Sequence, residues 1–120
     1  MNNIKVLLVD DVDFVLASTR SSLKREFDVY TATNGKEALD ILQSRKIDCL
    51  VTDINMPVMD GIELLKEINE NGIDIKTIVI QGTYDHRLKK AFTGLKVDIF
   101  IKKPYLPNDL IKGIRTLLEY

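Results

Sequence analysis

The chain has 120 residues, of which 45% are hydrophobic and 29% are charged, and these values are typical of a single globular domain with a packed core. The net charge of -1 gives no general attraction to nucleic acid or to anionic membranes. No apolar run approaches the roughly 20 residues that a membrane helix needs, so we expect no membrane insertion.

Predicted strands and helices alternate from the start of the chain. The first strand covers 4–9, which is almost entirely apolar and fits a buried strand rather than a signal peptide. A helix over about 12–26 and a short strand over 29–32 come next. A second helix follows, and Asn34 and Glu37 have the spacing of a reciprocal capping box at its start.

The central predicted strand covers 47–53, and a helix over about 61–71 follows it. Asp60 and Glu63 can form a capping box at the start of this helix, and Gly72 suits a left-handed stop at its end. The remaining elements are a strand over 76–81, a helix that ends near Gly94, a strand over 97–101 and a helix that begins near Pro107, after the poor cap residue Leu106.

This alternation predicts one α/β domain over 1–120, with a five-stranded parallel sheet and helices on both of its faces. A strand order of 2-1-3-4-5 would place the ends of the first and third strands side by side, where such sheets bind ligands. Cys49, the only cysteine in the sequence, lies inside the central strand. It excludes an internal disulfide and favours a cytoplasmic location.

Charged residues follow three of the apolar strands. Asp10 and Asp11 follow the first strand, Asp53 ends the third and Lys103 follows the fifth. If the strand order holds, the carboxylates converge, and they repel one another unless a cation such as Mg²⁺ neutralises them. Lys103 could then pair with Asp53 or with a phosphoryl group. The cluster therefore suits phosphoryl transfer to the protein itself.

Three segments closely resemble the signatures of bacterial response-regulator receiver domains: Val9-Asp10-Asp11, the run from Asp53 to Gly61, and Lys103-Pro104-Tyr105. The resemblance covers nearly the whole chain, with matching order and spacing. Among receivers, the chain is most similar in type to the single-domain, chemotaxis-type regulators, because no residues remain for an output domain. The resemblance implies the flavodoxin-like, doubly wound fold with five helices.

The resemblance also implies a role for each site residue. Asp53 would be the phosphoacceptor, and Lys103 would contact the phosphoryl group. Asp11, Asp53 and the backbone carbonyl of Asn55 would bind Mg²⁺ directly, whereas Asp10 would hold metal-bound water. The Lys103–Pro104 peptide bond is expected to be cis.

One position departs from the family. Receivers carry Thr or Ser at the end of the fourth strand, and an aromatic residue on the fifth strand moves with the phosphoryl group. Phe100 has the aromatic position, but Gln81 has the Thr/Ser position. Two interpretations stay open: Gln81 binds the phosphoryl group through its amide or hinders the switch, or Thr83 supplies the missing hydroxyl.

The resemblance implies a signalling switch and not an enzyme acting on a separate metabolite. A sensor histidine kinase or phosphotransfer protein would donate the phosphoryl group, and a downstream protein target would read the change; direct nucleic acid binding is not expected. One alternative is a degenerate receiver that binds its partner constitutively because of Gln81. Another is a small Mg²⁺-dependent phosphatase. Two features speak against it: Asn55 stands where a general acid would be needed, and there is no cap domain to enclose a substrate.

Overall fold

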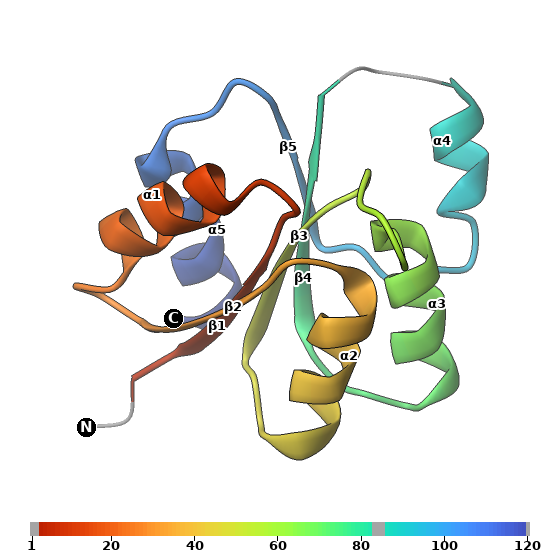
Figure 1. Cartoon of the computed structure of the whole chain (residues 1–120), viewed down its shortest axis with the longest axis horizontal. Helices are drawn as coiled ribbons and strands as arrows, with labels where there is room; N and C mark the ends of the chain where they lie inside the picture. The colour runs from red at the N-terminus through yellow and green to blue at the C-terminus, as the bar shows by residue number, and fades with distance from the viewer. Residues whose placement is uncertain (1–2, 83–85, 120) are drawn as a thin grey trace.

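The computed structural model describes residues 3–82 and 86–119, in which strands and helices alternate from the N-terminal strand to the C-terminal helix (Figure 1). The strands are β1 (Lys5–Val9), β2 (Asp28–Ala32), β3 (Cys49–Asp53), β4 (Lys76–Gln81) and β5 (Ile99–Lys102). The helices are α1 (Asp13–Leu23), α2 (Gly35–Ser44), α3 (Gly61–Glu70), α4 (His86–Ala91) and α5 (Pro107–Leu118).

The strands form one parallel sheet in the order β2-β1-β3-β4-β5, as the sequence predicts. β1 and β3 are neighbours, and Val9 is the register partner of Thr52. Because the strands are parallel, the segments that leave β1, β3 and β5 emerge at the same edge of the sheet. This edge therefore brings together residues that are far apart in the sequence.

Apolar side chains fill both sides of the sheet. Leu50 and Leu64 belong to the layer that α2 and α3 cover, whereas Val51, Leu23 and Ile114 belong to the layer that α1 and α5 cover. All five residues of β3 are buried, as expected for a central strand with helices on both faces. Within the described residues, no helix has the length and apolar character needed to span a membrane.

Several element ends differ from the predicted ones. α1 ends at Leu23 and not near residue 26, because Leu23 and Phe27 are both buried and the N–H groups of Glu26 and Phe27 turn back to the carbonyl of Leu23. α4 ends at Ala91, earlier than predicted. β5 is displaced toward the C-terminus from the predicted range of 97–101.

The predicted capping boxes have different outcomes. At α3 the box is complete, because Glu63 N–H donates to Asp60 Oδ1 at 2.9 Å and Asp60 N–H donates to Glu63 Oε1 at 3.3 Å. At α2 the prediction of a reciprocal box was wrong. Asn34 Oδ1 accepts from Glu37 N–H at 2.9 Å, but the Glu37 carboxylate binds the N–H and hydroxyl groups of Thr33 instead.

Two other predicted helix ends are confirmed. Gly72 follows α3 with a φ of 63°, in the left-handed region that suits glycine. Leu106 provides no side-chain cap for α5. The carboxylate of Asp109 instead accepts from Leu106 N–H at 2.8 Å, and Pro107 occupies the first turn, where its missing N–H costs nothing.

Candidate functional site

Two buried carboxylates lie at the edge where β1 and β3 end. Asp53 is the last residue of β3, and Asp10 directly follows β1. Their exposed fractions are only 6% and 7%. Asp10 Oδ1 accepts from Val12 N–H at 2.9 Å, and Asp53 Oδ1 accepts from Ile54 N–H at 2.7 Å. One oxygen of each carboxylate is thus fixed by the backbone.

The loop after Asp53 folds tightly against it at Gly61. Gly61 N–H donates to the carbonyl of Ile54 at 2.8 Å. A Cβ atom at position 61 would collide with the carbonyl oxygen of Asp53 and would lie 2.9 Å from the Cα of Ile54. Only glycine permits this approach, so Gly61 sets the path of the loop that leads from Asp53 into α3.

Lys103 reaches Asp53 from the end of β5. Its Nζ atom lies 2.6 Å from Asp53 Oδ2, and its side chain is 42% exposed. The backbone holds the lysine at this place, because Lys103 N–H donates to the carbonyl of Gln81 at 2.8 Å. The Lys103–Pro104 peptide bond is cis, in agreement with the expectation from the resemblance. The structure thus joins two residues that lie fifty positions apart in the sequence.

The electrostatics of this edge are strongly coupled. Burial raises the pKa of Asp10, the Val12 N–H lowers it, and the charge of Asp53 raises it further, so the pKa of Asp10 lies above its ordinary value. Burial alone would lower the pKa of Lys103, but the hydrogen bond and charge of Asp53 outweigh it and hold that pKa above its ordinary value. Asp53 therefore has a firmly charged partner, whereas no residue that the structure describes gives Asp10 a partner of comparable strength.

The predicted metal-binding residues only partly converge. Asp11 and Asn55 belong to the same edge but are exposed, and Asp11 is close enough to contribute to the raised pKa of Asp10. Among the described residues, no three His, Cys, Asp or Glu side chains form a ready metal-binding group. The donor set still has the chemistry of a hard-cation site, because it consists of carboxylate and carbonyl oxygens around an under-neutralised carboxylate.

Two of the predicted switch residues, Gln81 and Phe100, lie along the same half of the sheet. Gln81 ends β4, half-buried. Phe100 is 45% exposed on β5, and its ring packs edge-on against Phe92, with 5.1 Å between the centroids. This exposure means that Phe100 has an outward orientation in this structure. The third predicted switch residue, Thr83, lies outside the described residues.

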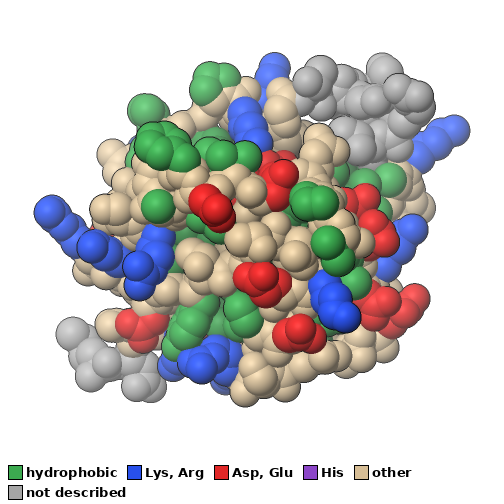
Figure 2. All heavy atoms as spheres, in the orientation of Figure 1, with side chains coloured by type: hydrophobic (Ala, Val, Ile, Leu, Met, Phe, Trp, Pro, Cys, Tyr) green, Lys and Arg blue, Asp and Glu red, His purple; other side chains and the backbone are tan. Residues whose placement is uncertain are grey.

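An apolar groove beside Lys103 was missed by the sequence reasoning. It has a volume of about 490 Å³ and runs between α1 and the segment that leads into α5, with Phe14, Pro104 and Tyr105 among its lining residues. Phe14 is 81% exposed. Figure 2 shows hydrophobic side chains gathered over these two elements, close to acidic ones. Helical spacing predicts only which face of α1 is buried, so it gave no signal for this groove.

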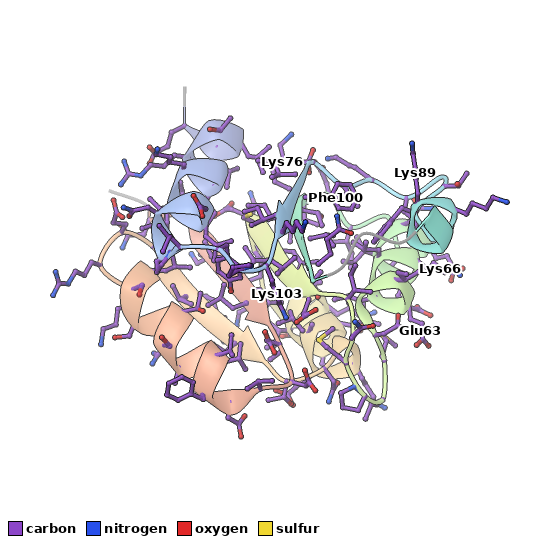
Figure 3. All side chains as sticks on the ribbon, turned by 90° about the horizontal axis from the view of Figure 1, so that it is seen from above. Glu63, Lys66, Lys76, Lys89, Phe100 and Lys103 are labelled. Atoms are coloured by element: carbon purple, nitrogen blue, oxygen red, sulfur yellow. The ribbon has the colours of Figure 1, made fainter. Side chains whose placement is uncertain are left out.

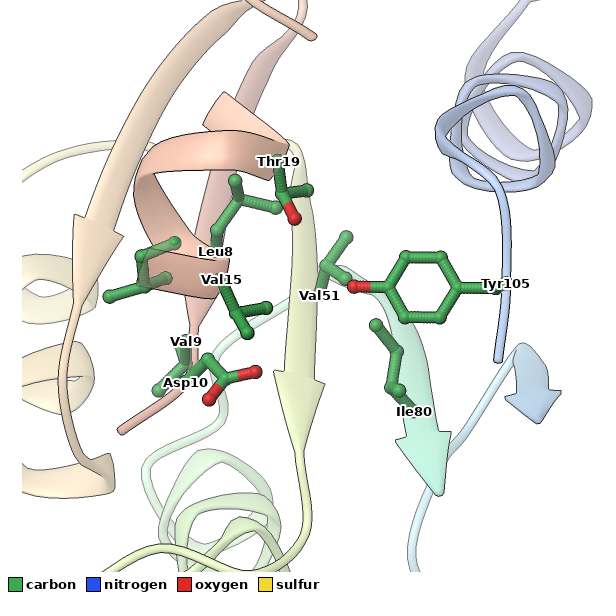
Figure 4. A pocket seen from close by; sticks show the side chains of 9 residues that line it. Leu8, Val9, Asp10, Val15, Thr19, Val51, Ile80 and Tyr105 are labelled. Atoms are coloured by element: carbon green, nitrogen blue, oxygen red, sulfur yellow. The ribbon is translucent and has the colours of Figure 1, made fainter. Parts of the chain in front are cut away.

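Tyr105 forms the inner wall of the groove. Figure 4 shows its hydroxyl pointing toward the sheet beneath α1, into a gap that Asp10, Thr19 and Val51 also line. This gap has a volume of about 10 Å³, about the minimum that one water molecule needs. The tyrosine ring thus separates the open groove from the packed layer below the acidic edge.

The chain belongs to the response regulator receiver domain family, which matches residues 6–115. It is 36% identical over 115 residues to the response regulator SaeR of Staphylococcus aureus, covering 94% of this chain and 50% of SaeR. It is 31% identical over 117 residues to the response regulator MprA of Mycolicibacterium vanbaalenii, covering 97% of this chain and 51% of MprA. The chain spans about half the length of these curated relatives.

Solved receiver structures have the same fold. The chemotaxis protein CheY4 of Vibrio cholerae matches with a TM-score of 0.88 and 27% identity, covering 97% of this chain and 99% of CheY4. A CheY-like receiver domain protein from Methanospirillum hungatei matches with a TM-score of 0.89 and 28% identity, covering 96% of this chain and 93% of that one. The chain is therefore a receiver domain of two-component signalling.

Proposed function

We propose that residues 1–120 form one receiver domain in which Asp53 accepts a phosphoryl group from the phosphohistidine of a sensor histidine kinase or phosphotransfer protein. The observation that carries this proposal is the 2.6 Å contact between Lys103 Nζ and Asp53 Oδ2 at the open edge of the sheet. A carboxylate that is buried yet charge-paired at such an edge is placed for chemistry rather than for packing.

The transfer needs only a nucleophile and charge compensation. A carboxylate oxygen of Asp53 attacks phosphorus, the bond from phosphorus to the imidazole nitrogen breaks, and its electron pair remains on that nitrogen. Ile54 N–H holds Asp53 Oδ1 in place during the attack. Lys103, whose side chain is partly exposed, can pass its hydrogen bond to an oxygen of the arriving group.

The residues that would hold Mg²⁺ are Asp11, Asp53 and the carbonyl of Asn55, with Asp10 acting through water. Bound Mg²⁺ supplies positive charge that offsets the carboxylates and the phosphoryl oxygens. The raised pKa of Asp10 supports this assignment, because burial and the neighbouring Asp53 leave this carboxylate short of positive charge. The all-oxygen donor set matches the preference of Mg²⁺.

The groove beside Lys103 suits the approach of the phosphodonor protein. Its apolar lining adjoins the lysine that contacts Asp53, so a partner bound there would bring its phosphohistidine to the acidic edge. Exposed apolar surface around a polar centre is typical of protein contacts that exclude water. A small phosphodonor has no use for this surface, whereas a protein donor does.

Acetyl phosphate with Mg²⁺, followed by intact-mass measurement, tests the phosphoacceptor. We expect the chain to gain the mass of one phosphoryl group and Asp53→Asn to gain none. Asp60→Asn is the matched control, because Asp60 caps α3 and asparagine caps equally well. An unlabelled chain, under conditions that label a known receiver, would contradict the proposed function.

The degenerate receiver remains a second candidate because Gln81 replaces the family's hydroxyl residue at the end of β4. Beryllofluoride, a phosphoryl mimic, separates the two functions. In a working switch, the mimic with Mg²⁺ shifts the NMR signals of residues in β5 as well as those near Asp53. If it binds and leaves the β5 signals unchanged, the site is uncoupled from the surface and the constitutive function is favoured.

A further inference from the structure

The chain between β3 and α3 runs over residues 54–60, which we call the β3–α3 loop. It carries part of the proposed Mg²⁺ site, because Asn55 would bind the ion through its backbone carbonyl. The hydrogen bond from Gly61 N–H to the carbonyl of Ile54 closes the base of this loop. That bond fixes where the loop starts and ends, whereas the residues between need contacts of their own to be ordered.

The turn in the middle of this loop has an unfavourable backbone conformation. Val58 has a φ of 68°, in the left-handed region that β-branched residues rarely adopt. Val58 is 76% exposed, so packing within the protein offsets little of that cost. Met59 N–H donates to the carbonyl of Pro57 at 2.7 Å across the same turn. Such a conformation persists only where the surrounding structure holds it.

The start of α2 supplies a contact that holds this turn. Gly35, the first residue of α2, donates its N–H to the carbonyl of Met59 at 2.8 Å. The first N–H groups of a helix have no partner within the helix, so this donor is available to a distant segment. Asn34 fixes the same helical turn by accepting from Glu37 N–H at 2.9 Å. Figure 1 shows α2 next to α3, the helix into which the loop leads.

Gly35 also lies too close to the loop for any side chain. A Cβ atom at position 35 would lie 2.7 Å from both the carbonyl oxygen and the Cγ atom of Met59. The flexible side chain of Met59 could move aside, but its carbonyl belongs to the main chain of the loop. Even alanine would therefore push the β3–α3 loop away from α2 and disrupt the hydrogen bond that holds it.

Gly35 and Lys103 approach the site from opposite sides of β3. β4 and β5 lie on one side, and Lys103 follows β5; β1 and β2 lie on the other side, and α2 follows β2. Figure 3, a view from above, shows Lys103 near the middle of the molecule and Glu63 at the start of α3, where the loop ends. Lys103 thus contacts the carboxylate of Asp53, whereas Gly35 contacts the loop that follows it.

We propose that Gly35 is a positioning residue for the phosphoacceptor site. It holds the β3–α3 loop, and with it the carbonyl of Asn55, in the place that Mg²⁺ binding requires. Gly35 acts through Met59 and not by contact with the reacting groups. This inference rests on the proposed function, because it concerns the Mg²⁺ assigned to the same site. Contacts that orient metal ligands typically change metal affinity by roughly 10–100-fold.

Amide hydrogen exchange of the unaltered chain tests the contact itself. An N–H group in the first turn of a helix exchanges quickly when water is its only partner. After correction for intrinsic rates, we expect the Gly35 amide to exchange at least about tenfold more slowly than the amide of Lys36, the exposed residue after it. Equal exchange of the two amides would overturn the inference.

Gly35→Ala tests what the contact does. Mg²⁺ titrations followed by NMR amide shifts measure ion binding without phosphorylation, and we expect the dissociation constant to rise about tenfold. In acetyl phosphate labelling, the variant should need correspondingly more Mg²⁺ for its half-maximal rate, and saturating Mg²⁺ should restore most of that rate. Gly113→Ala is the matched control, because its Cβ would also meet a close neighbour, Ile78, but in α5. It should leave Mg²⁺ affinity unchanged.

Two further variants separate positioning from stability. Met59→Ala removes a side chain that packs against the core but keeps the carbonyl that accepts from Gly35. It should lower the midpoint of urea unfolding and leave Mg²⁺ affinity within about twofold. A backbone ester at position 35 replaces the N–H with oxygen and adds no side chain, so it should weaken Mg²⁺ binding even if Gly35→Ala does not fold.

Wild-type Mg²⁺ affinity in Gly35→Ala or in the ester, or equal losses in Gly35→Ala and Met59→Ala, would overturn the inference. The outcome is separable from the proposed function. If the unaltered chain takes up no phosphoryl group, the proposed function fails, whereas amide exchange and Mg²⁺ titration still test Gly35. If the chain is labelled and Gly35→Ala binds Mg²⁺ as tightly as the unaltered chain, only this inference fails.

Discussion

The surroundings of Asp10 disfavour its ionised form. Burial raises its pKa and Asp53 and Asp11 add to the effect, whereas Val12 N–H and Lys103 oppose it. A carboxyl group whose pKa is higher in the folded state binds its proton more tightly there. Its ionised form therefore lowers stability above the raised pKa, and this penalty disappears as the pH falls through that pKa toward the unfolded value.

Asp10→Asn should therefore stabilise the metal-free protein at neutral pH, by about 1 kcal/mol in the free energy of unfolding. Asparagine keeps the Oδ1 acceptor for Val12 N–H but removes the charge. Urea unfolding with EDTA over a pH series measures the effect, which should vanish below the ordinary carboxyl pKa of 3.8. Asp74→Asn, which replaces an exposed acid that precedes β4, is the control. A gain for Asp10→Asn that does not change with pH would contradict this account.

At the scale of elements, two aspartates fix how neighbouring strands begin. Asp48 N–H donates to the carbonyl of Lys5, and its carboxylate accepts from Lys5 N–H at 2.8 Å. Asp98 makes the same two contacts with Thr77, at 2.9 and 2.8 Å. Each aspartate thus satisfies an N–H group at the start of the adjacent strand and sets the register of the pair.

Asp98→Ala should lower the free energy of unfolding by about 1–2 kcal/mol, because it leaves the N–H of Thr77 without its acceptor in a largely buried position. Asp98→Asn keeps an oxygen acceptor and should cost less. Asp74→Ala, an exposed acid that precedes β4, serves as the control. Urea titrations compare the three, and equal effects of Asp98→Ala and Asp74→Ala would show that the contact is unimportant.

The sequence predicts features whose signals are local or follow from strand order. The box of Asp60 and Glu63 depends on four consecutive residues, and the meeting of Asp53 with Lys103 follows once the sheet order is known. Other features depend on tertiary choices that spacing does not record. Glu37 has two acceptable partners and takes Thr33, and the exposure of Phe14 depends on how α1 and α5 leave a groove between them.

At the scale of the whole molecule, the thiol of Cys49 becomes accessible to a reagent only when the fold opens. It is fully buried in β3, the central strand. Burial, together with the charges of Asp98 and Asp48, raises the pKa of its thiol to about 12. Both the missing access and the missing thiolate make this thiol unreactive in the native state.

Alkylation of Cys49 should therefore report global unfolding. With iodoacetamide at neutral pH, we expect negligible labelling of the native chain and labelling that rises with urea along the same curve as circular dichroism. Ser22→Cys adds an exposed thiol on α1 as an internal control that reacts at once, and peptide mass spectrometry separates the two sites. Rapid modification of Cys49 without urea would reveal local opening of the sheet.

The close approach of Gly61 to Asp53 has a consequence for mutational tolerance. Any β-carbon at this position must displace the main chain on which the phosphoacceptor is mounted, so even alanine should impair phosphorylation while most of the fold survives. A saturation mutagenesis library would thus score position 61 as intolerant to substitution, like the reactive residues Asp53 and Lys103. The cause would be the path of the main chain, since glycine has no side chain that could take part in the reaction.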